Sequence, residues 1–95
     1  MSEQLAASAV VATGAAARYA KQLASHLGRK AEVREEDGGT RLLLAGGDCL
    51  LTATDEALVL EAHAPDQEAL DRVTDVVGRH LERFGQRHEL VVVWR

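Results

Sequence analysis

Residues 66–95 read DQEALDRVTDVVGRHLERFGQRHELVVVWR, and this stretch decides the fold. Its longer first part repeats an apolar residue at steps of three and four, which is the spacing of one face of an α-helix. Its end, residues 90–94, is a short run of apolar, mostly β-branched side chains that predicts a strand. We expect the helix to pack on a sheet that contains this strand. The apolar stripe of the helix consists of Leu70, Val73, Val77, Leu81 and Phe84.

The beginning of this helix is also marked in the sequence. Pro65 ends a predicted strand over residues 57–63, and Asp66 has the short oxygen-bearing side chain that caps a helix. Phe84 on the helix and Trp94 on the last strand are the only Phe and the only Trp of the chain. Because aromatic side chains bury large areas, we expect the main packing contact of the fold between these two.

The middle of the chain is typical of short strands separated by turns. Residues 31–35 alternate apolar and polar side chains, which predicts a strand with one solvent-exposed face. Asp37-Gly38-Gly39 predicts a hairpin, because glycine adopts positive φ without steric cost. Gly46-Gly47 predicts a bend or bulge between residues 41–45 and 49–53, which form either one bent strand or two.

The first third of the chain predicts a strand followed by a helix. Residues 6–12 form the strand, and the hydroxyl of Thr13 is a candidate N-cap. The helix spans residues 15–27, and Gly28 is placed to end it. Its apolar positions are Ala16, Ala20, Leu23 and Leu27.

The predicted element order is therefore β-α-β-β-β-α-β, with room for one more strand in the middle. This order predicts a single α+β domain over residues 1–95, a two-layer sandwich in which two helices cover one face of a mostly antiparallel sheet. Its 95 residues suffice to bury a core without disulfides or metals.

Composition excludes several classes of protein. A net charge of −4 and only three aromatic residues argue against a nucleic-acid partner, which needs clustered cations and stacking side chains. No apolar run approaches the roughly 20 residues that span a membrane. The single cysteine, Cys49, excludes an internal disulfide and fits a reducing compartment. We therefore expect a cytoplasmic protein without a membrane partner.

Several short motifs point to a known family. They are Ala17-Arg18-Tyr19 with Lys21-Gln22-Leu23 and His26, Gly47-x-Cys49-x-Leu51, and His80-Leu81-Glu82-Arg83-Phe84 with Glu89-Leu90-x-Val92-x-Trp94. In these motifs the chain resembles the bacterial domain-of-unknown-function family 2218 over nearly its whole length, although Ala16 stands where that family is expected to have proline. The resemblance implies the fold, no assigned activity, and an accessory role in iron handling beside siderophore-uptake and siderophore-reduction proteins.

The sequence predicts no catalytic residue, metal site or cofactor. A metal site needs three or four converging ligands, usually with one pair at short spacing, and none of the four histidines has another nearby. We interpret each as lying near a helix C-terminus, where it binds free carbonyls. His26 and His80 approach each other only if the two helices lie side by side. Cys49 lies in an apolar strand and is interpreted as a buried structural thiol.

Polar side chains on the two helices form the candidate ligand site. One interpretation is an anion-binding groove between the helices, in which arginines hold a carboxylate or phosphate. The other is an ordinary solvated face, because Asp71, Asp75 and Glu82 are spaced to pair with the arginines of the second helix. The candidate residues are Arg18, Tyr19, Gln22, His26, His80 and Arg83.

The sheet face without helices is the candidate interface. Strand alternation directs Val59, Val91 and Val93 to that face, and exposed apolar patches are typical of partner surfaces. Scattered exposed valines are also common on strands. We expect a homodimer or a docking surface here. A siderophore-pathway protein is a further expected partner, without a place on the surface.

Two functions follow from these residues. The first is a small cytoplasmic binding or interaction module, accessory to siderophore or iron handling. The alternative is a small enzyme-like domain that binds an anion or metal at the inter-helix Arg/His/Tyr surface. No nucleophile lies beside a base in the predicted arrangement, so we favour the non-enzymatic function.

Overall fold

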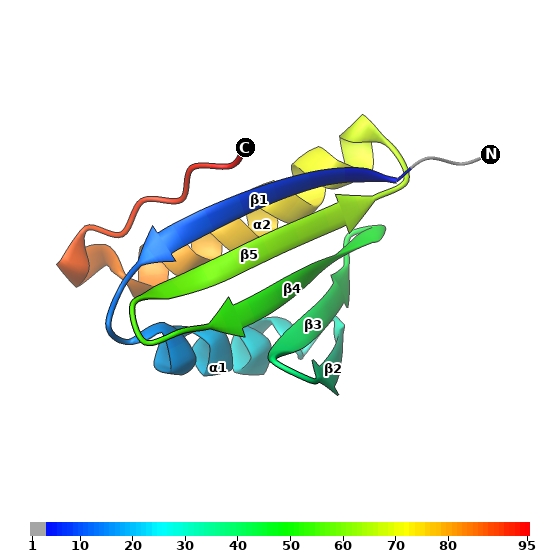
Figure 1. Cartoon of the computed structure of the whole chain (residues 1–95). Coiled ribbons are helices and arrows are strands. Elements are labelled where there is room, and N and C mark those ends of the chain that lie inside the picture. The colour runs from blue at the N-terminus through cyan, green and yellow to red at the C-terminus, as the bar shows by residue number, and fades with distance from the viewer. Residues whose placement is uncertain (1–3) are drawn as a thin grey trace.

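A computed structural model describes residues 4–95, so residues 1–3 of the predicted domain lie outside the described residues. Two layers are present, a five-stranded sheet and two helices that cover one of its faces (Figure 1). The elements follow each other as β1 (Leu5–Ala12), α1 (Ala16–Leu27), β2 (Glu32–Glu36), β3 (Gly39–Leu44), β4 (Gly47–Ala53), β5 (Ala57–Ala64), α2 (Gln67–Phe84) and the short 3-10 helix η1 (Gln86–His88).

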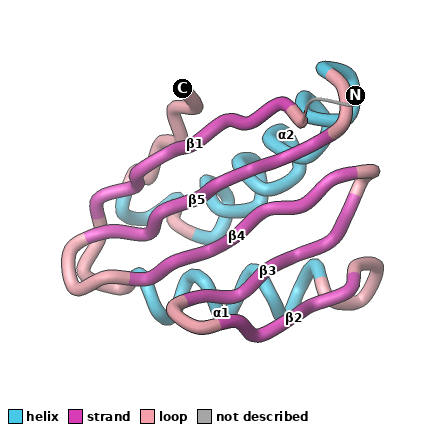
Figure 2. The backbone as a smooth tube through the Cα atoms, turned by 45° about the vertical axis from the view of Figure 1, so that its right-hand side comes forward, coloured by secondary structure: helices cyan, strands magenta, loops and turns pink. Residues whose placement is uncertain are grey.

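The strands lie in the order β1-β5-β4-β3-β2, and every neighbouring pair is antiparallel (Figure 2). The predicted α+β class with two helices on one face is confirmed. Four strands lie between the helices, because β3 and β4 are separate strands joined by the two-residue turn Ala45-Gly46. Both turn residues have positive φ, 53° and 88°, which is the geometry of a type I′ hairpin.

The prediction that the chain ends in a regular strand is wrong. Residues 90–95 run beside β1 (Figure 1), but only Ser8 and Arg95 exchange backbone hydrogen bonds, of 3.0 and 2.8 Å. The segment is held by α2 instead, because the Glu82 carboxylate accepts a hydrogen bond from the Val92 N–H at 2.9 Å. Side-chain alternation persists without the ladder: Leu90, Val92 and Trp94 pack on the core, while Val91, Val93 and Arg95 are exposed.

The main packing contact does not lie between Phe84 and Trp94, contrary to the prediction. Both side chains are half-buried, and they line different hollows. Trp94 lies over Gly78, where an added Cβ would stand 3.2 Å from the indole Nε1, whereas Phe84 lies against His26. The centre of the core is aliphatic, and its fully buried side chains include Leu23, Leu42, Leu51, Leu58, Leu60, Val73, Val77 and Leu81.

The ends of the helices differ in how they are capped. The Asp66 carboxylate accepts a hydrogen bond from the Ala69 N–H at 2.8 Å, as predicted. Thr13 is not the N-cap of α1, because the helix begins at Ala16 and the Thr13 hydroxyl accepts only from the Ala15 N–H. Gly28 ends α1 but keeps right-handed φ of −62°, and an added Cβ would stand 2.5 Å from the Ala24 carbonyl oxygen.

Strand β2 is exposed along its whole length, so the prediction of one exposed face underestimated its contact with solvent. It is the edge strand of the sheet, whereas the helices pack chiefly on β1, β3, β4 and β5. No helix of the described residues is long and apolar enough to cross a membrane.

Candidate functional site

His26 and His80 meet where α1 and α2 lie side by side. Their ring centroids are 5.0 Å apart, and the ring planes are inclined by 46°. The rings of His26 and Phe84 are nearly perpendicular, with an interplanar angle of 79°, and their centroids are 5.5 Å apart. The approach expected for helices lying side by side therefore occurs, although the two histidines are 54 positions apart in the sequence.

One histidine of this pair is fixed by its own helix. The Nδ1 of His80 lies 2.6 Å from the carbonyl oxygen of Val76, one turn earlier. A carbonyl only accepts, so this contact places the proton of a neutral His80 ring on Nδ1 and leaves the Nε2 lone pair free. The carbonyl belongs to the interior of α2, so the predicted role of His80 in binding a free terminal carbonyl is not what the structure shows.

Beside the two rings lies a hollow of about 470 Å³. It is bounded by the end of α1 and the loop after it, by α2, and by the turn between β3 and β4. Part of its wall is aliphatic and part is cationic. The lining residues are His26, Leu27, Arg29, Lys30, Ala31, Leu44, Ala45, Val76 and His80.

A second hollow, of about 450 Å³, continues along α1 and shares His26 and Arg29 with the first. Its lining residues are Arg18, Lys21, Gln22, Ser25, His26, Arg29 and Phe84. We call the two hollows together the basic groove. Among residues 4–95, no aspartate or glutamate lines either hollow, although the whole chain carries a net charge of −4.

The cations of the groove differ from those on α2. Within residues 4–95, Arg18, Lys21, Arg29 and Lys30 form no salt bridge. On α2, by contrast, Arg72 pairs with Glu68 at 3.0 Å and Arg79 with Asp75 at 2.7 Å. Of the three predicted carboxylate partners on α2, only Asp75 pairs with an arginine, because Asp71 accepts from Gln67 and Glu82 accepts from the Val92 N–H. Among the described residues, the cations of α1 and of the loop after it are free for an anion.

The structure brings together four of the six predicted site residues. Arg18, Gln22, His26 and His80 line the groove. Tyr19 is 3% exposed and lines another hollow, near Thr13 and His88, while Arg83 is exposed outside the groove. The predicted site did not include four lining residues, which are Lys30, Leu44, Ala45 and Val76. The pair Arg29-Lys30 after Gly28 indicated Lys30 in the sequence, whereas no pattern indicated Leu44 and Ala45 beside the turn.

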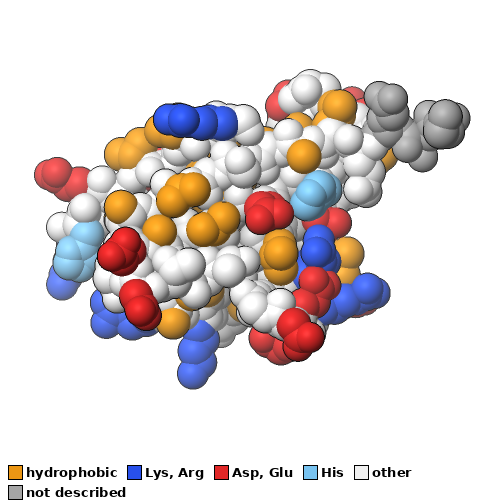
Figure 3. All heavy atoms as spheres, viewed as in Figure 1, with side chains coloured by type: hydrophobic (Ala, Val, Ile, Leu, Met, Phe, Trp, Pro, Cys, Tyr) orange, Lys and Arg blue, Asp and Glu red, His pale blue; other side chains and the backbone are white. Residues whose placement is uncertain are grey.

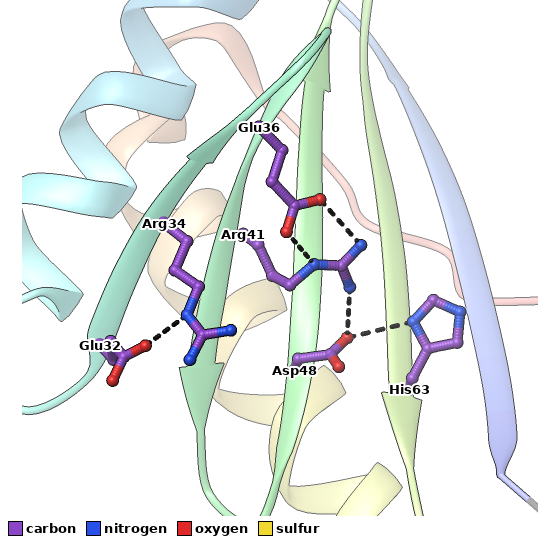
Figure 4. A network of polar contacts seen from close by, with 6 residues as sticks. All are labelled: Glu32, Arg34, Glu36, Arg41, Asp48 and His63. Carbon is purple, nitrogen blue, oxygen red and sulfur yellow. Dashed lines mark hydrogen bonds and ion pairs between the residues drawn. The ribbon is translucent and has the colours of Figure 1, made fainter.

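The open face of the sheet carries a polar network (Figure 4). Asp48 accepts from the Arg41 guanidinium at 3.1 Å and contacts the His63 Nδ1 at 3.1 Å, while Arg41 also donates two hydrogen bonds to Glu36. These bonds lower the pKa of the Glu36 carboxyl and raise the pKa of Arg41. The network joins β2, β3, β4 and β5 across one side of the sheet.

The other side of the open face is apolar. Val10, Val91 and Val93 are 70, 65 and 61% exposed, and Val59 is half-buried opposite Val10 in the β1–β5 register. Hydrophobic side chains gather over β1 and β5 in Figure 3, and charged side chains gather toward β2 and β3. The sequence prediction missed Val10, because the alanine-rich first strand showed no clear alternation.

Cys49 is fully buried and lies on the helix-covered face, paired with Leu42 and Ala62 across the sheet. Burial, assisted by the nearby Asp48 carboxylate, raises the pKa of its thiol to about 12. The interpretation as a structural thiol agrees with this position. No group of three or more His, Cys, Asp or Glu side chains converges as a metal site within residues 4–95.

The topology and the two covering helices define a small α+β two-layer domain. A family model described as "Uncharacterized protein conserved in bacteria (DUF2218)" matches residues 8–95, so the chain belongs to this family. The chain is also similar to PA4090 from Pseudomonas aeruginosa, known from an NMR structure, with 28% identity and a TM-score of 0.78 over 95% of this chain and 94% of that chain. No curated protein matches the chain.

Proposed function

We propose that this domain is a non-enzymatic binding module that holds a small organic anion in the basic groove. The observation that carries the proposal is the lining itself: four cations without ion-pair partners among residues 4–95, two histidines and no carboxylate. Arginine forks bind carboxylates and phosphates through paired hydrogen bonds, and lysine adds a point charge.

The apolar wall narrows the class of ligand. The first hollow, of about 470 Å³, is lined beside its cations by Leu27, Leu44 and Val76. A ligand that combines an anionic group with an apolar or aromatic part would fill both kinds of surface, and a volume of about 470 Å³ lies within the usual range of small-molecule sites. Siderophores and their fragments have such chemistry, and the family resemblance supports a place beside siderophore or iron-handling proteins.

The enzyme-like alternative has less support from the groove. Within the described part of the chain, Ser25 is the only residue with a hydroxyl that lines the groove, and it lies on the exposed face of α1. The thiol of Cys49 lies in the core, where its raised pKa keeps it protonated at neutral pH. Binding and release of a ligand need only the cations and the shape of the groove.

A titration followed by amide NMR tests the proposal, with inorganic phosphate, citrate and 2,3-dihydroxybenzoate as probes. We expect the shifts to centre on Ala45, Val76 and Lys30, and Arg29→Ala to weaken binding about tenfold, since a hydrogen bond to a charged group contributes about 1.5–3 kcal/mol. Arg79→Ala is the matched control, because it removes a cation of α2 outside the groove. Equal affinities in the two variants would exclude the groove as the binding site.

We further propose that the apolar side of the open sheet face forms a homodimer interface. The supporting observation is that, among residues 4–95, the most exposed large apolar side chains are Val10, Val91 and Val93. A twofold interface uses the same patch on both copies. Sedimentation at rising concentration should show a dimer that Val10→Asp abolishes and the β2 variant Val33→Asp preserves; a monomer at millimolar concentration would contradict it.

A further inference from the structure

We propose that His26 and His80 form a two-histidine binding site for a transition-metal ion that enters the basic groove as an anionic chelate. The proposal rests on the proposed function and adds the class of ligand: a small chelator that carries its own metal and leaves coordination positions open. The protein supplies the two imidazoles, and the chelator supplies the remaining ligands.

The separation of the two rings fits one shared ion. Imidazole nitrogens bind zinc and similar ions at about 2.0–2.1 Å, so two rings on one ion at a tetrahedral angle have centroids about 5 Å apart. The centroids of His26 and His80 are 5.0 Å apart. The rings are also tilted against each other rather than stacked, which allows a nitrogen of each to be directed at one point.

His80 already has the hydrogen bond that metal-binding histidines require. A ligating imidazole almost always donates its other N–H to a carboxylate, a carbonyl or water, which fixes the ring and raises its basicity. The Val76 carbonyl is 2.6 Å from the His80 Nδ1, so Nε2 is the free ligand atom. Phe84 packs against both rings and limits their reorientation.

The charges around the pair select a chelate over a bare ion. Arg29 and Lys30 line the same hollow, and Arg18 and Lys21 line the adjoining one, and no carboxylate of the described residues 4–95 lines either. A bare dication would be repelled by these charges, whereas a metal enclosed by carboxylate or phenolate groups arrives with a net negative charge. Two imidazoles alone also leave a transition metal with unfilled positions.

Nickel(II) nitrilotriacetate is a suitable probe, because it is an anion whose metal keeps two positions open. Calorimetric titration of the tag-free protein compares three ligands: this chelate, metal-free nitrilotriacetate and nickel chloride. We expect the chelate to bind tightest, and His26→Ala and His80→Ala each to weaken it about tenfold or more. His88→Ala, at an exposed histidine of η1, is the matched control.

The three ligands separate this inference from the proposed function. Metal-free nitrilotriacetate tests the proposed function without a metal: we expect Arg29→Ala to bind it more weakly than the original chain does, and its failure to bind the original chain at all would overturn the proposed function. If the chelate binds His26→Ala as tightly as His88→Ala, the proposed two-histidine binding site is overturned. His26 is exposed, so its replacement leaves the fold intact even where His80→Ala unfolds.

A copper(II) iminodiacetate complex gives an independent readout. Electron paramagnetic resonance detects the nitrogens bound to copper, and we expect two imidazoles in the original chain and one in either single variant. A single imidazole bound to copper in the original chain would show that the two rings do not share an ion, and would overturn the proposed two-histidine binding site.

Discussion

Cys49 illustrates how neighbours set the chemistry of one side chain. Its thiol is inaccessible, and its raised pKa of about 12 results first from burial and then from the Asp48 carboxylate. Thiolate is the reactive form, so the folded protein should not react with iodoacetamide at pH 8. We expect labelling only through unfolding, at a rate that rises with urea. Fast labelling of the native protein, followed by mass spectrometry, would contradict this.

The same shift makes the stability of the protein depend on pH. The thiol pKa is about 12 in the folded protein against an ordinary value of 9.0, so the unfolded chain loses this proton first as pH rises. The contribution of the protonated Cys49 thiol to the free energy of unfolding is fully present below pH 9 and decreases as pH rises toward 12. Urea unfolding between pH 8 and 10.5 should show a falling free energy, and Cys49→Ala should have a shallower slope; parallel slopes would disprove the linkage.

Ala45 is a non-glycine residue in the left-handed region, with φ of 53°. Asparagine tolerates this region better than alanine, and Asn-Gly is the preferred pair for a type I′ turn. We therefore expect Ala45→Asn to stabilise the fold by about 0.5–1 kcal/mol. The control is Ala53→Asn at an exposed position of β4, where no gain is expected. Urea unfolding measures both, and a loss of stability in Ala45→Asn would contradict the argument.

At the scale of elements, the segment 90–95 shows that side-chain pattern and backbone pairing are separable. The Ser8–Arg95 pair directs the outward backbone groups of β1 toward this segment, so the Val10 N–H also faces it. No hydrogen bond joins Val10 to Val93, and a hollow of about 400 Å³ lies between them. The pattern of apolar side chains predicted contact with the core, which is correct, and ladder pairing, which is not.

Hydrogen exchange tests this partial pairing. We expect the amides of Ser8 and Arg95 to be protected and that of Val10 to exchange much faster than that of Ala9, which faces β5. Uniform protection from Ser8 to Val10 would show that the segment is a full sixth strand in solution. Trp94→Ala should speed exchange at Ser8, because Trp94 is one of the contacts that hold the segment against α2.

How much could be predicted from the sequence depends on the range of the interaction. The stripe from Leu70 to Leu81, the Asp66 cap and the Asp37-Gly38 hairpin are local features, and all three are present. The basic groove is not local: its cations lie on α1 and on the loop after it, its aliphatic wall comes from α1, β3 and α2, and only the packing of both helices on one sheet brings them together. Tyr19 shows the converse, since helical spacing grouped it with polar residues while packing buried it.

At the scale of the whole molecule, the groove connects ligand binding to stability. Its walls come from segments that separate on unfolding, so an anion bound there stabilises only the folded state. A ligand at ten times its dissociation constant contributes about 1.4 kcal/mol, which raises the melting temperature of a domain of this size by about 6–11 °C. We expect citrate or a metal chelate to produce such a shift, and Arg29→Ala to reduce it.

Salt separates this effect from general stabilisation by anions. Screening weakens attraction between exposed charges as ionic strength rises, so the shift at fixed citrate should shrink between about 0.05 and 0.5 M sodium chloride. Anions that stabilise only by exclusion from the protein surface act on the original chain and on Arg29→Ala alike. A shift that is independent of salt and identical in the two proteins would therefore assign the stabilisation to the solvent and not to the groove.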